Sequence, residues 1–182
     1  MDFFPTSIPD VVLVKPRVFG DERGFFLESW QEEKFAAAGI DAHFVQDNHS
    51  RSVRNTLRGL HYQIRQEQGK LVRVTRGAAF DVAVDLRSSS PTFGKYLGVE
   101  LSAASRDMLW VPPGFAHGFL ALEDGTEFQY KCTAYYAPEH ERVIAWNDPD
   151  LAIAWPLGAG ESPRLSPRDA AAGSFRAAEY FP

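Results

Sequence analysis

The chain has 182 residues, of which 45% are hydrophobic and 24% are charged, as in an ordinary globular protein. With 19 Lys and Arg against 24 Asp and Glu, its net charge of −5 disfavours a general nucleic-acid binder. No apolar run approaches the ~20 residues of a membrane span, and the single cysteine, Cys132, excludes a disulfide scaffold. The first residues show neither the basic nor the apolar region of a signal peptide, so we expect a cytoplasmic protein with no membrane partner.

Short strands with turn signals between them are predicted along most of the chain. They are expected over residues 11–14, 44–48, 71–75, 80–86, 96–101, 107–111, 117–122, 127–135 and 142–146. Arg76-Gly77 lies between the third and fourth of these and predicts a hairpin turn. Alternation along three of the strands predicts residues that share a face: Phe44, Gln46 and Asn48; Phe80, Val82, Val84 and Leu86; and Phe128, Tyr130 and Cys132.

Helical signals are few. Ser29-Trp30-Gln31-Glu32 has the form of a capping box and predicts a short helix that ends before Gly39. Ser166-Pro167-Arg168-Asp169 resembles a second helix start, and residues 157–164 are expected to form a loop. Many short strands at regular spacing predict one all-β domain over residues 1–182, a closed double-sheet barrel with an N-terminal strand segment and a helical tail.

Cationic residues gather between positions 51 and 76, where Glu67 is the only acid. They are Arg51, Arg54, Arg58, Arg65, Lys70, Arg73 and Arg76. Such a cluster in an acidic protein suggests a small anionic ligand such as a phosphate ester. A solvated strand face with acidic partners elsewhere in the fold explains it equally well.

Two histidines lie in patterns that resemble the two motifs of cupin barrels. Residues 112–117 have the Pro-x-Gly-x-x-His spacing of the second motif and end at His117, and His61-Tyr62-Gln63 stands where metal-binding cupins have His-x-His. Gln63 replaces the second histidine, and an amide is a poor ligand for a transition metal. We therefore expect no metal, although His61, His117 and Glu67 could still form an open site.

Without a metal, four residues could carry proton chemistry. His61 is a candidate general base, and Asp169 could orient it or could merely cap a helix. Lys70 could stabilise an oxyanion, although taken alone it is predicted to be an exposed lysine at a strand edge. Tyr130 on an inward face is either a proton donor or a phenol held by a core hydrogen bond.

The combination is far more specific than its parts. From Arg23-Gly24-Phe25-Phe26 to Ser166-Pro167-Arg168-Asp169 the chain resembles the dTDP-4-dehydrorhamnose 3,5-epimerase family. Among the matching stretches are residues 44–50, 57–63, 69–72, 81–87, 90–94, 114–119, 130–131 and 146–149.

The resemblance implies a metal-free, cupin-like jelly roll and a homodimer. It also implies an enzyme that epimerises the dTDP-sugar dTDP-4-dehydro-6-deoxy-D-glucose at C3 and C5 to dTDP-4-dehydro-L-rhamnose without a cofactor. It implies that His61 is the general base, that Asp169 holds it, that Lys70 stabilises an enolate, and that Tyr130 returns a proton from the opposite face. The residues that match positions lining the nucleotide-sugar site are Arg23, Glu28, Gln46, Asn48, Arg58, His117, Glu141 and Arg168. Tyr136 matches the aromatic residue that stacks on thymine. Simple alternation puts Arg58 and His61 on opposite faces, so we predict a bulge or twist at Gly59.

Three alternatives remain open. An epimerase acting at C3 or C5 alone would carry nearly the same residues. A metal-dependent cupin enzyme would hold a stoichiometric metal on His61 and His117. A non-enzymatic sugar-nucleotide binder would bind without hydrogen exchange, but pure binding needs no base and acid on opposite faces.

Overall fold

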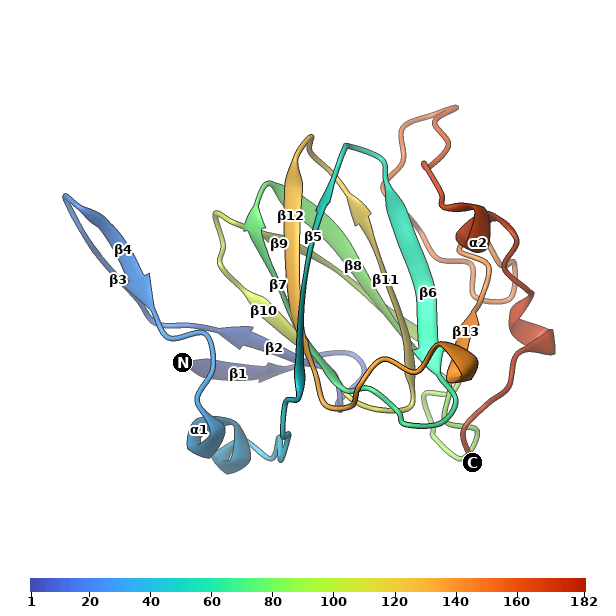
Figure 1. The fold of residues 1–182 in the computed structure, drawn as a ribbon, viewed down its shortest axis with the longest axis horizontal. Helices are drawn as coiled ribbons and strands as arrows, with labels where there is room; N and C mark the ends of the chain where they lie inside the picture. The colour runs from blue at the N-terminus through green and yellow to red at the C-terminus, as the bar shows by residue number, and fades with distance from the viewer.

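Two antiparallel sheets face each other in the computed structural model, which describes residues 1–182 (Figure 1). The six-stranded sheet has the order β1 (Asp2–Pro5), β2 (Val12–Lys15), β10 (Met108–Val111), β7 (Lys70–Arg76), β12 (Thr126–Cys132) and β5 (Gln46–Ser52). The five-stranded sheet has the order β13 (Glu141–Val143), β6 (Leu57–Gln63), β11 (Phe115–Ala121), β8 (Ala78–Asp85) and β9 (Tyr96–Ser102). This nearly all-β arrangement confirms the expected jelly-roll class.

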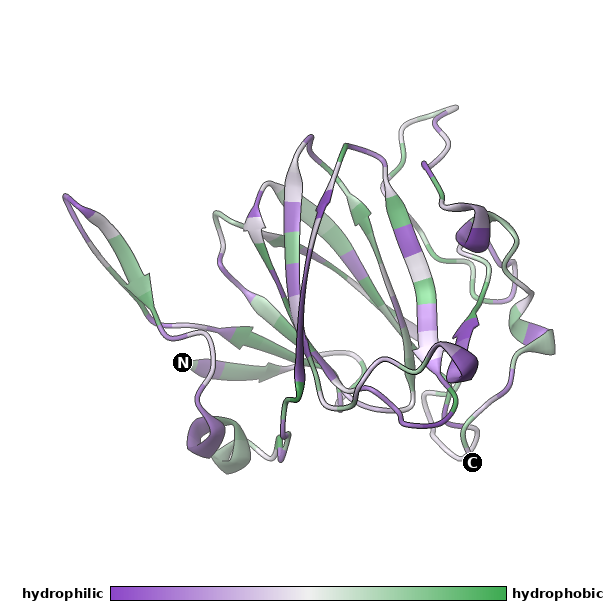
Figure 2. Cartoon of the chain, in the orientation of Figure 1, coloured by the Kyte–Doolittle hydropathy of each residue, from purple (hydrophilic) through white to green (hydrophobic).

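The main core lies between the two sheets. Val72 of β7, Ala83 of β8, Phe119 of β11 and Phe128 of β12 meet there, and the rings of Phe119 and Phe128 stack with centroids 4.0 Å apart. Figure 2 shows hydrophilic and hydrophobic residues alternating along β12, as expected of a strand with one face inward. The predicted inward face of β12 is confirmed, since Phe128 and Cys132 are fully buried and Tyr130 packs on the core.

β8 is buried on both faces, and the predicted apolar face does not line the barrel interior. Val82, Val84 and Leu86 share a face as predicted, but they pack outside the barrel against Leu151 and Phe181 of the C-terminal segment. This segment covers the outer face of the five-stranded sheet (Figure 1). The opposite face of β8 therefore supplies the barrel interior.

The hairpin expected at Arg76-Gly77 does not form. β7 pairs with β10 and β12, whereas β8 pairs with β9 and β11 in the other sheet. Gly77 has φ +71°, and a Cβ there would lie 2.7 Å from Oγ1 of Thr126. A tight turn at Gly77 thus carries the chain from one sheet to the other instead of reversing it within one.

Two predictions near the N-terminal helix are wrong. The helix α1 (Glu32–Ala37) begins after Gln31, whose side chain accepts the Lys34 N–H at 2.7 Å, so Ser29 is not its cap. Phe44 precedes β5 and does not share the face of Gln46 and Asn48. It packs on Trp30 in a cluster on the outer face of β7 and β10, because Trp110 and Phe35 form an apolar surface there.

The remaining elements are short. They are the 3-10 turns at Pro138–His140 and Phe175–Ala177 and the helix α2 (Pro167–Ala170), which follows the predicted start at Ser166. Residues 157–164 form no helix or strand, as predicted. None of the helices combines the length and the apolar character needed to cross a membrane.

One ribbon stands apart from both sheets. β3 (Val18–Asp21) and β4 (Gly24–Leu27) pair only with each other and project from the barrel (Figure 1). Phe19, Phe25 and Phe26 on this ribbon are 51%, 59% and 68% exposed, and Figure 2 colours most of β4 as hydrophobic. We call residues 18–27 the arm.

Candidate functional site

A cavity with two adjoining lobes lies between the sheets. The lobes measure about 190 and 230 Å³, and both are lined by His61, Lys70 and Tyr130. The first lobe adds Gln46, Asn48, Tyr62, Gln63, Gln68, Tyr136 and Glu141, and the second adds Ser50, Arg58, His117, Phe119, Phe128, Ser166, Arg168 and Asp169. All the predicted site residues except Arg23 and Glu28 therefore line one continuous space.

His61 and Asp169 form a pair at the edge of this cavity. His61 comes from β6, Asp169 comes from α2, and Nε2 of His61 lies 2.6 Å from Oδ1 of Asp169. The Asp169 side chain is 3% exposed, whereas that of His61 is 31% exposed. With the Nε2 proton directed at the carboxylate, Nδ1 is left as the nitrogen that can take a proton.

Ser166 fixes the carboxylate of Asp169, a role that our sequence reasoning did not assign. Its hydroxyl donates to Oδ2 of Asp169 at 2.9 Å and accepts the Asp169 N–H at 3.1 Å, as an N-cap residue does. Burial alone would raise the pKa of Asp169, but the hydrogen bond and positive charge of His61 and the bonds from Ser166 outweigh it and lower the pKa. The carboxylate is therefore held in its ionised form beside the imidazole.

Lys70 is buried, contrary to the expectation for this residue taken alone. It is the first residue of β7, is 7% exposed and points into both lobes. Burial lowers the pKa of its ammonium, and the charges of Asp81 and Glu141 offset part of that effect. A desolvated cation with no bound carboxylate can give its charge to an oxygen that becomes negative in the cavity.

Tyr130 lies on the opposite sheet from His61. Its strand, β12, belongs to the six-stranded sheet, whereas β6 belongs to the five-stranded one. Burial raises the pKa of the Tyr130 phenol, so the group keeps its proton at neutral pH. The cavity thus has an imidazole on one wall and a protonated phenol on the other.

The irregularity predicted at Gly59 is confirmed. The register between β6 and β11 shifts between the pair His117 and His61 and the pair Phe119 and Arg58. Gly59 has φ +141°, and a Cβ there would lie 2.6 Å from Cα of Gly118. The shift brings Arg58 to the same cavity as His61, where its Nε donates to Oγ of Ser52 at 3.2 Å.

Asp81 is a second residue that our sequence reasoning missed. Its carboxylate is fully buried, and its two oxygens lie 3.0 and 2.9 Å from Nε2 of His117. Asp81 lies between Phe80 and Val82 in a strand otherwise rich in apolar residues. An acid at such a position predicts a pairing partner elsewhere in the fold, because a buried carboxylate needs one.

Polar contacts organise the far end of the first lobe. The Tyr136 hydroxyl donates to Oε2 of Glu141 at 2.6 Å, and an Arg168 N–H donates to the same oxygen. The Tyr136 N–H donates to Oε1 of Gln46 at 2.9 Å, and Nε2 of Gln46 donates to Oδ1 of Asn48 at 3.1 Å. The Tyr136 ring is left half-exposed at the mouth of the lobe.

Arg23 and Glu28 lie outside the cavity. Arg23 is at the tip of the arm, where its side chain is 85% exposed and pairs with Asp21. Glu28 follows β4 and pairs with Lys34 of α1 at 2.6 Å. Within one chain, neither residue reaches the other predicted site residues.

The predicted cationic cluster does not act as a unit. Of its seven members, Arg58 and Lys70 line the cavity. Arg73 faces a different hollow, of about 300 Å³, on the outer face of the sheet, and Arg54 pairs with Glu161. Alternation along β7 sends Lys70 and Arg73 to opposite faces, and Arg168 from α2 supplies the third cation of the cavity.

The residues of the cavity do not fit a metal site. Nε2 of His61 is bonded to Asp169, and Nε2 of His117 is bonded to Asp81. Glu67, the third ligand considered, is exposed in the loop after β6. No group of three His, Cys, Asp or Glu side chains in the chain is arranged so that it could hold a metal ion.

Comparison with known proteins gives a consistent result. Residues 5–177 match the family model described as dTDP-4-dehydrorhamnose 3,5-epimerase. A dTDP-4-dehydrorhamnose 3,5-epimerase from Pseudomonas aeruginosa is 58% identical over 177 residues, which cover 97% of each chain.

Solved structures are similar over the same extent. A dTDP-6-deoxy-D-glucose-3,5-epimerase from Legionella pneumophila, solved with dTDP-4-keto-L-rhamnose, has 51% identity and a TM-score of 0.94 over 98% of this chain and 94% of that one. A 3'-monoepimerase from Streptomyces bikiniensis, solved with dTDP-quinovose, has 38% identity and a TM-score of 0.87 over 93% and 86% of the two chains.

Proposed function

Because the chain belongs to the dTDP-4-dehydrorhamnose 3,5-epimerase family, we propose that it converts dTDP-4-dehydro-6-deoxy-D-glucose to dTDP-4-dehydro-L-rhamnose by inverting C3 and C5. The observation that carries the proposal is the pairing of His61 with Asp169 on one wall of a cavity whose other wall presents Lys70 and Tyr130. In this account residues 1–182 work as a single catalytic domain of a cytoplasmic enzyme.

The first step is proton abstraction by His61. The C4 ketone acidifies the hydrogens at C3 and C5, and His61 removes one of them with the nitrogen that Asp169 leaves free. The C–H electron pair moves into the ring and leaves an enolate with its charge on the C4 oxygen. Asp169 stabilises the imidazolium that forms, and Lys70 stabilises the enolate oxygen.

The second step is reprotonation from the opposite face. Tyr130 gives its phenolic proton to the carbon, the configuration at that carbon inverts, and Tyr130 is left as a phenolate. Exchange with water returns a proton to Tyr130 and removes one from His61, so that the pair can act at the second carbon. The base and the acid come from different sheets, so a sugar ring between the sheets meets one on each face. Neither carbon is oxidised or reduced overall, and the reaction needs no redox cofactor.

Binding of the nucleotide falls to the remaining groups of the cavity. Arg58 and Arg168 supply charged donors for the pyrophosphate, and His117 lies beside them in the same lobe. The exposed ring of Tyr136 offers a surface for thymine, with Glu141, Gln46 and Asn48 around it.

The arm is best explained by a homodimer. Three exposed phenylalanines and an unburied Arg23 project from the barrel, although the resemblance assigns Arg23 to the nucleotide-sugar site. We infer that the arm of each protomer packs against the barrel of its partner and brings Arg23 and Glu28 to that partner's cavity. Burial of the phenylalanines would stabilise such a dimer.

Proton NMR of dTDP-4-dehydro-6-deoxy-D-glucose with the purified protein in D₂O tests the proposed reaction. We expect deuterium at both C3 and C5 together with the L-rhamno product. Deuterium at one carbon alone would identify a single-site epimerase. Binding without any exchange would identify a sugar-nucleotide binder and overturn the proposed reaction.

A further inference from the structure

Gln63 is a buried amide whose hydrogen bonds all go to the protein backbone. It is the last residue of β6 and is 4% exposed. Its Nε2 donates to the carbonyl of Gln66 at 2.7 Å and to that of Tyr135 at 3.2 Å, and its Oε1 accepts the Ala137 N–H at 2.8 Å. Two acceptors face one end of the amide and one donor faces the other, so the partners fix which end is nitrogen.

These bonds hold two segments together beside the first lobe of the cavity. One is the loop that follows β6, and the other is the segment 133–137 that follows β12. Gln68 and Gly69 also connect the two segments. Nε2 of Gln68 donates to the carbonyl of Ala134 at 2.9 Å, and the Gly69 N–H donates to Oγ1 of Thr133 at 2.8 Å. The segment 133–137 is therefore anchored along its length.

Gln63 is hydrogen-bonded to the segment 133–137 on both sides of Tyr136. It bonds the carbonyl of the residue before Tyr136 and the N–H of the residue after it. The Tyr136 N–H and hydroxyl are in turn bonded to Gln46 and Glu141. The place of the Tyr136 ring at the mouth of the lobe thus depends on backbone groups that Gln63 holds.

Gln63 has no N–H left for a ligand, because both hydrogens of its amide are used. It stands where metal-binding cupins have their second histidine, but its side chain turns to the backbone and not to a bound group. A catalytic role would require a free donor or a titratable group in contact with the substrate.

We propose that Gln63 is a positioning residue, which sets the affinity for the nucleoside part of the substrate by holding the segment that carries Tyr136. This proposal rests on the proposed function, in which Tyr136 binds the base. In this arrangement one strand, β6, has two roles. His61 performs the chemistry, and Gln63, two residues later, organises nucleotide binding.

Calorimetric titration with dTDP and with inorganic pyrophosphate tests the proposal on the full chain. Gln63→Met keeps the length of the side chain but removes its hydrogen bonds, and Gln63→Glu keeps the acceptor alone. Because buried carbonyls lose their partners in both variants, we expect affinity for dTDP to fall about tenfold or more. Affinity for pyrophosphate, which has no base, should stay within about twofold of wild type. Gln31→Glu, which keeps the N-cap acceptor of α1, is the matched control and should bind dTDP normally.

Steady-state kinetics and a double-mutant cycle complete the test. For Gln63→Met we expect KM to rise while kcat is retained, because the groups at the reacting carbons are untouched. Tyr136→Ala should weaken dTDP binding, and adding Gln63→Met to it should cause little further loss.

Equal losses for dTDP and pyrophosphate, or effects that multiply in the double variant, would overturn the proposal and leave Gln63 a general structural residue. A Tyr136→Ala chain that binds dTDP like wild type would instead remove the base-binding role from the proposed function, and the proposal with it. If Gln63→Glu does not fold, Gln63→Met carries the same comparison.

Discussion

The cavity holds two histidine–aspartate pairs, and they differ in what they can do. His117 is 8% exposed, and its Nε2 is shared between both oxygens of Asp81. His61 is 31% exposed, and its partner Asp169 is fixed separately by Ser166. An exchangeable proton must reach the base, so the accessible and oriented imidazole of His61 is the better candidate.

Replacement of His61 tests that assignment. A positioned base contributes about 10²–10⁴-fold in rate. His61→Ala should therefore lower the rate of epimerisation by at least about 100-fold and abolish exchange at C3 and C5. The chain should stay folded by circular dichroism, since the His61 side chain is partly exposed. His43→Ala, at an exposed position before β5, should behave like wild type. Unchanged exchange in His61→Ala would remove the general-base assignment.

Among the strands, β6 has the most unusual construction. The register shift at Gly59 lets Arg58 and His61, three residues apart, serve one cavity. A regular strand would send these two side chains to opposite faces. Glycine is required at position 59, because the backbone there has a positive φ and because any Cβ would collide with Gly118.

Gly59→Ala should therefore damage both stability and activity. The added Cβ would meet Cα of Gly118 at 2.6 Å, and we expect a loss of about 1–3 kcal/mol in the free energy of unfolding with a fall in kcat. Gly173→Ala is the control, because a Cβ there meets nothing within 4 Å. Urea denaturation of the two variants checks this, and equal stability would argue against the strained position.

The elements show where sequence reasoning succeeds and where it stops. The shift at Gly59 could be predicted because the family resemblance assigns both Arg58 and His61 to the site, which strict alternation does not allow. The turn at Gly77 was misread, because a glycine turn between two strands does not reveal whether they share a sheet. The pattern around Lys70, taken alone, predicts an exposed lysine, because its burial comes from strands far away in the chain, and the pairing of Asp81 with His117 depends on the same packing.

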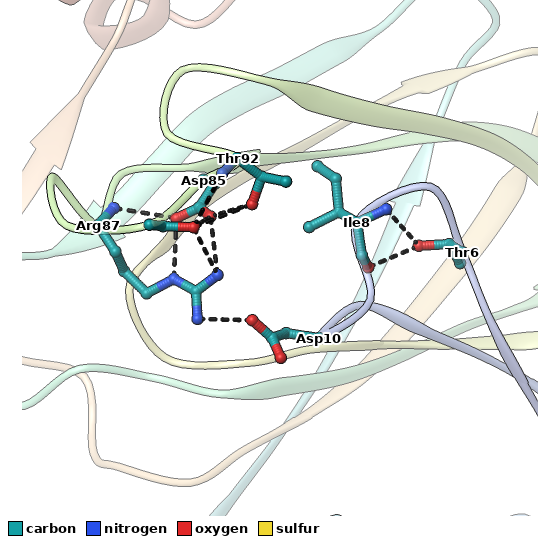
Figure 3. A network of polar contacts seen from close by, with 7 residues as sticks. Thr6, Ile8, Asp10, Asp85, Arg87 and Thr92 are labelled. Atoms are coloured by element: carbon teal, nitrogen blue, oxygen red, sulfur yellow. Dashed lines mark hydrogen bonds and ion pairs between the residues drawn. The ribbon is translucent and has the colours of Figure 1, made fainter.

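A polar network fastens the loop after β8 to the N-terminal segment (Figure 3). Asp85 is fully buried and accepts hydrogen bonds from Arg87, Ser90 and Thr92, and Arg87 reaches Asp10 at 2.8 Å. Burial would raise the pKa of Asp85, but these donors lower it from 3.8 to about 2. The carboxylate therefore stabilises the fold fully above about pH 4, and this contribution is lost as pH falls through about 2.

Asp85→Asn should reveal that contribution. A pKa lowered to about 2 corresponds to about 2 kcal/mol, so the variant should be less stable than wild type by about that amount at neutral pH. The difference should shrink as the pH falls from 5 towards 2, because the wild-type carboxylate becomes protonated. Denaturation curves across that range measure it, and a difference independent of pH would contradict the account.

On the scale of the whole molecule, the proposed dimer predicts that two defective chains can complement each other. One chain carries His61→Ala with an intact arm, and the other carries Arg23→Ala with an intact barrel. Random mixing makes half of the dimers mixed, each with one complete site, so roughly a quarter of wild-type activity should return after the two are refolded together. Activity no higher than that of the two parents would contradict exchange of the arm.

In the proposed reaction, the two sheets present a base and an acid to opposite faces of one sugar ring. Tyr130→Phe tests it most directly, with exchange and inversion followed together by NMR in D₂O. His61 can still remove a proton and return deuterium to the same face, whereas the opposite face has lost its donor. We expect deuterium at C3 and C5 without matching formation of the inverted product. Inversion at the wild-type rate, or exchange that falls as far as inversion does, would contradict it.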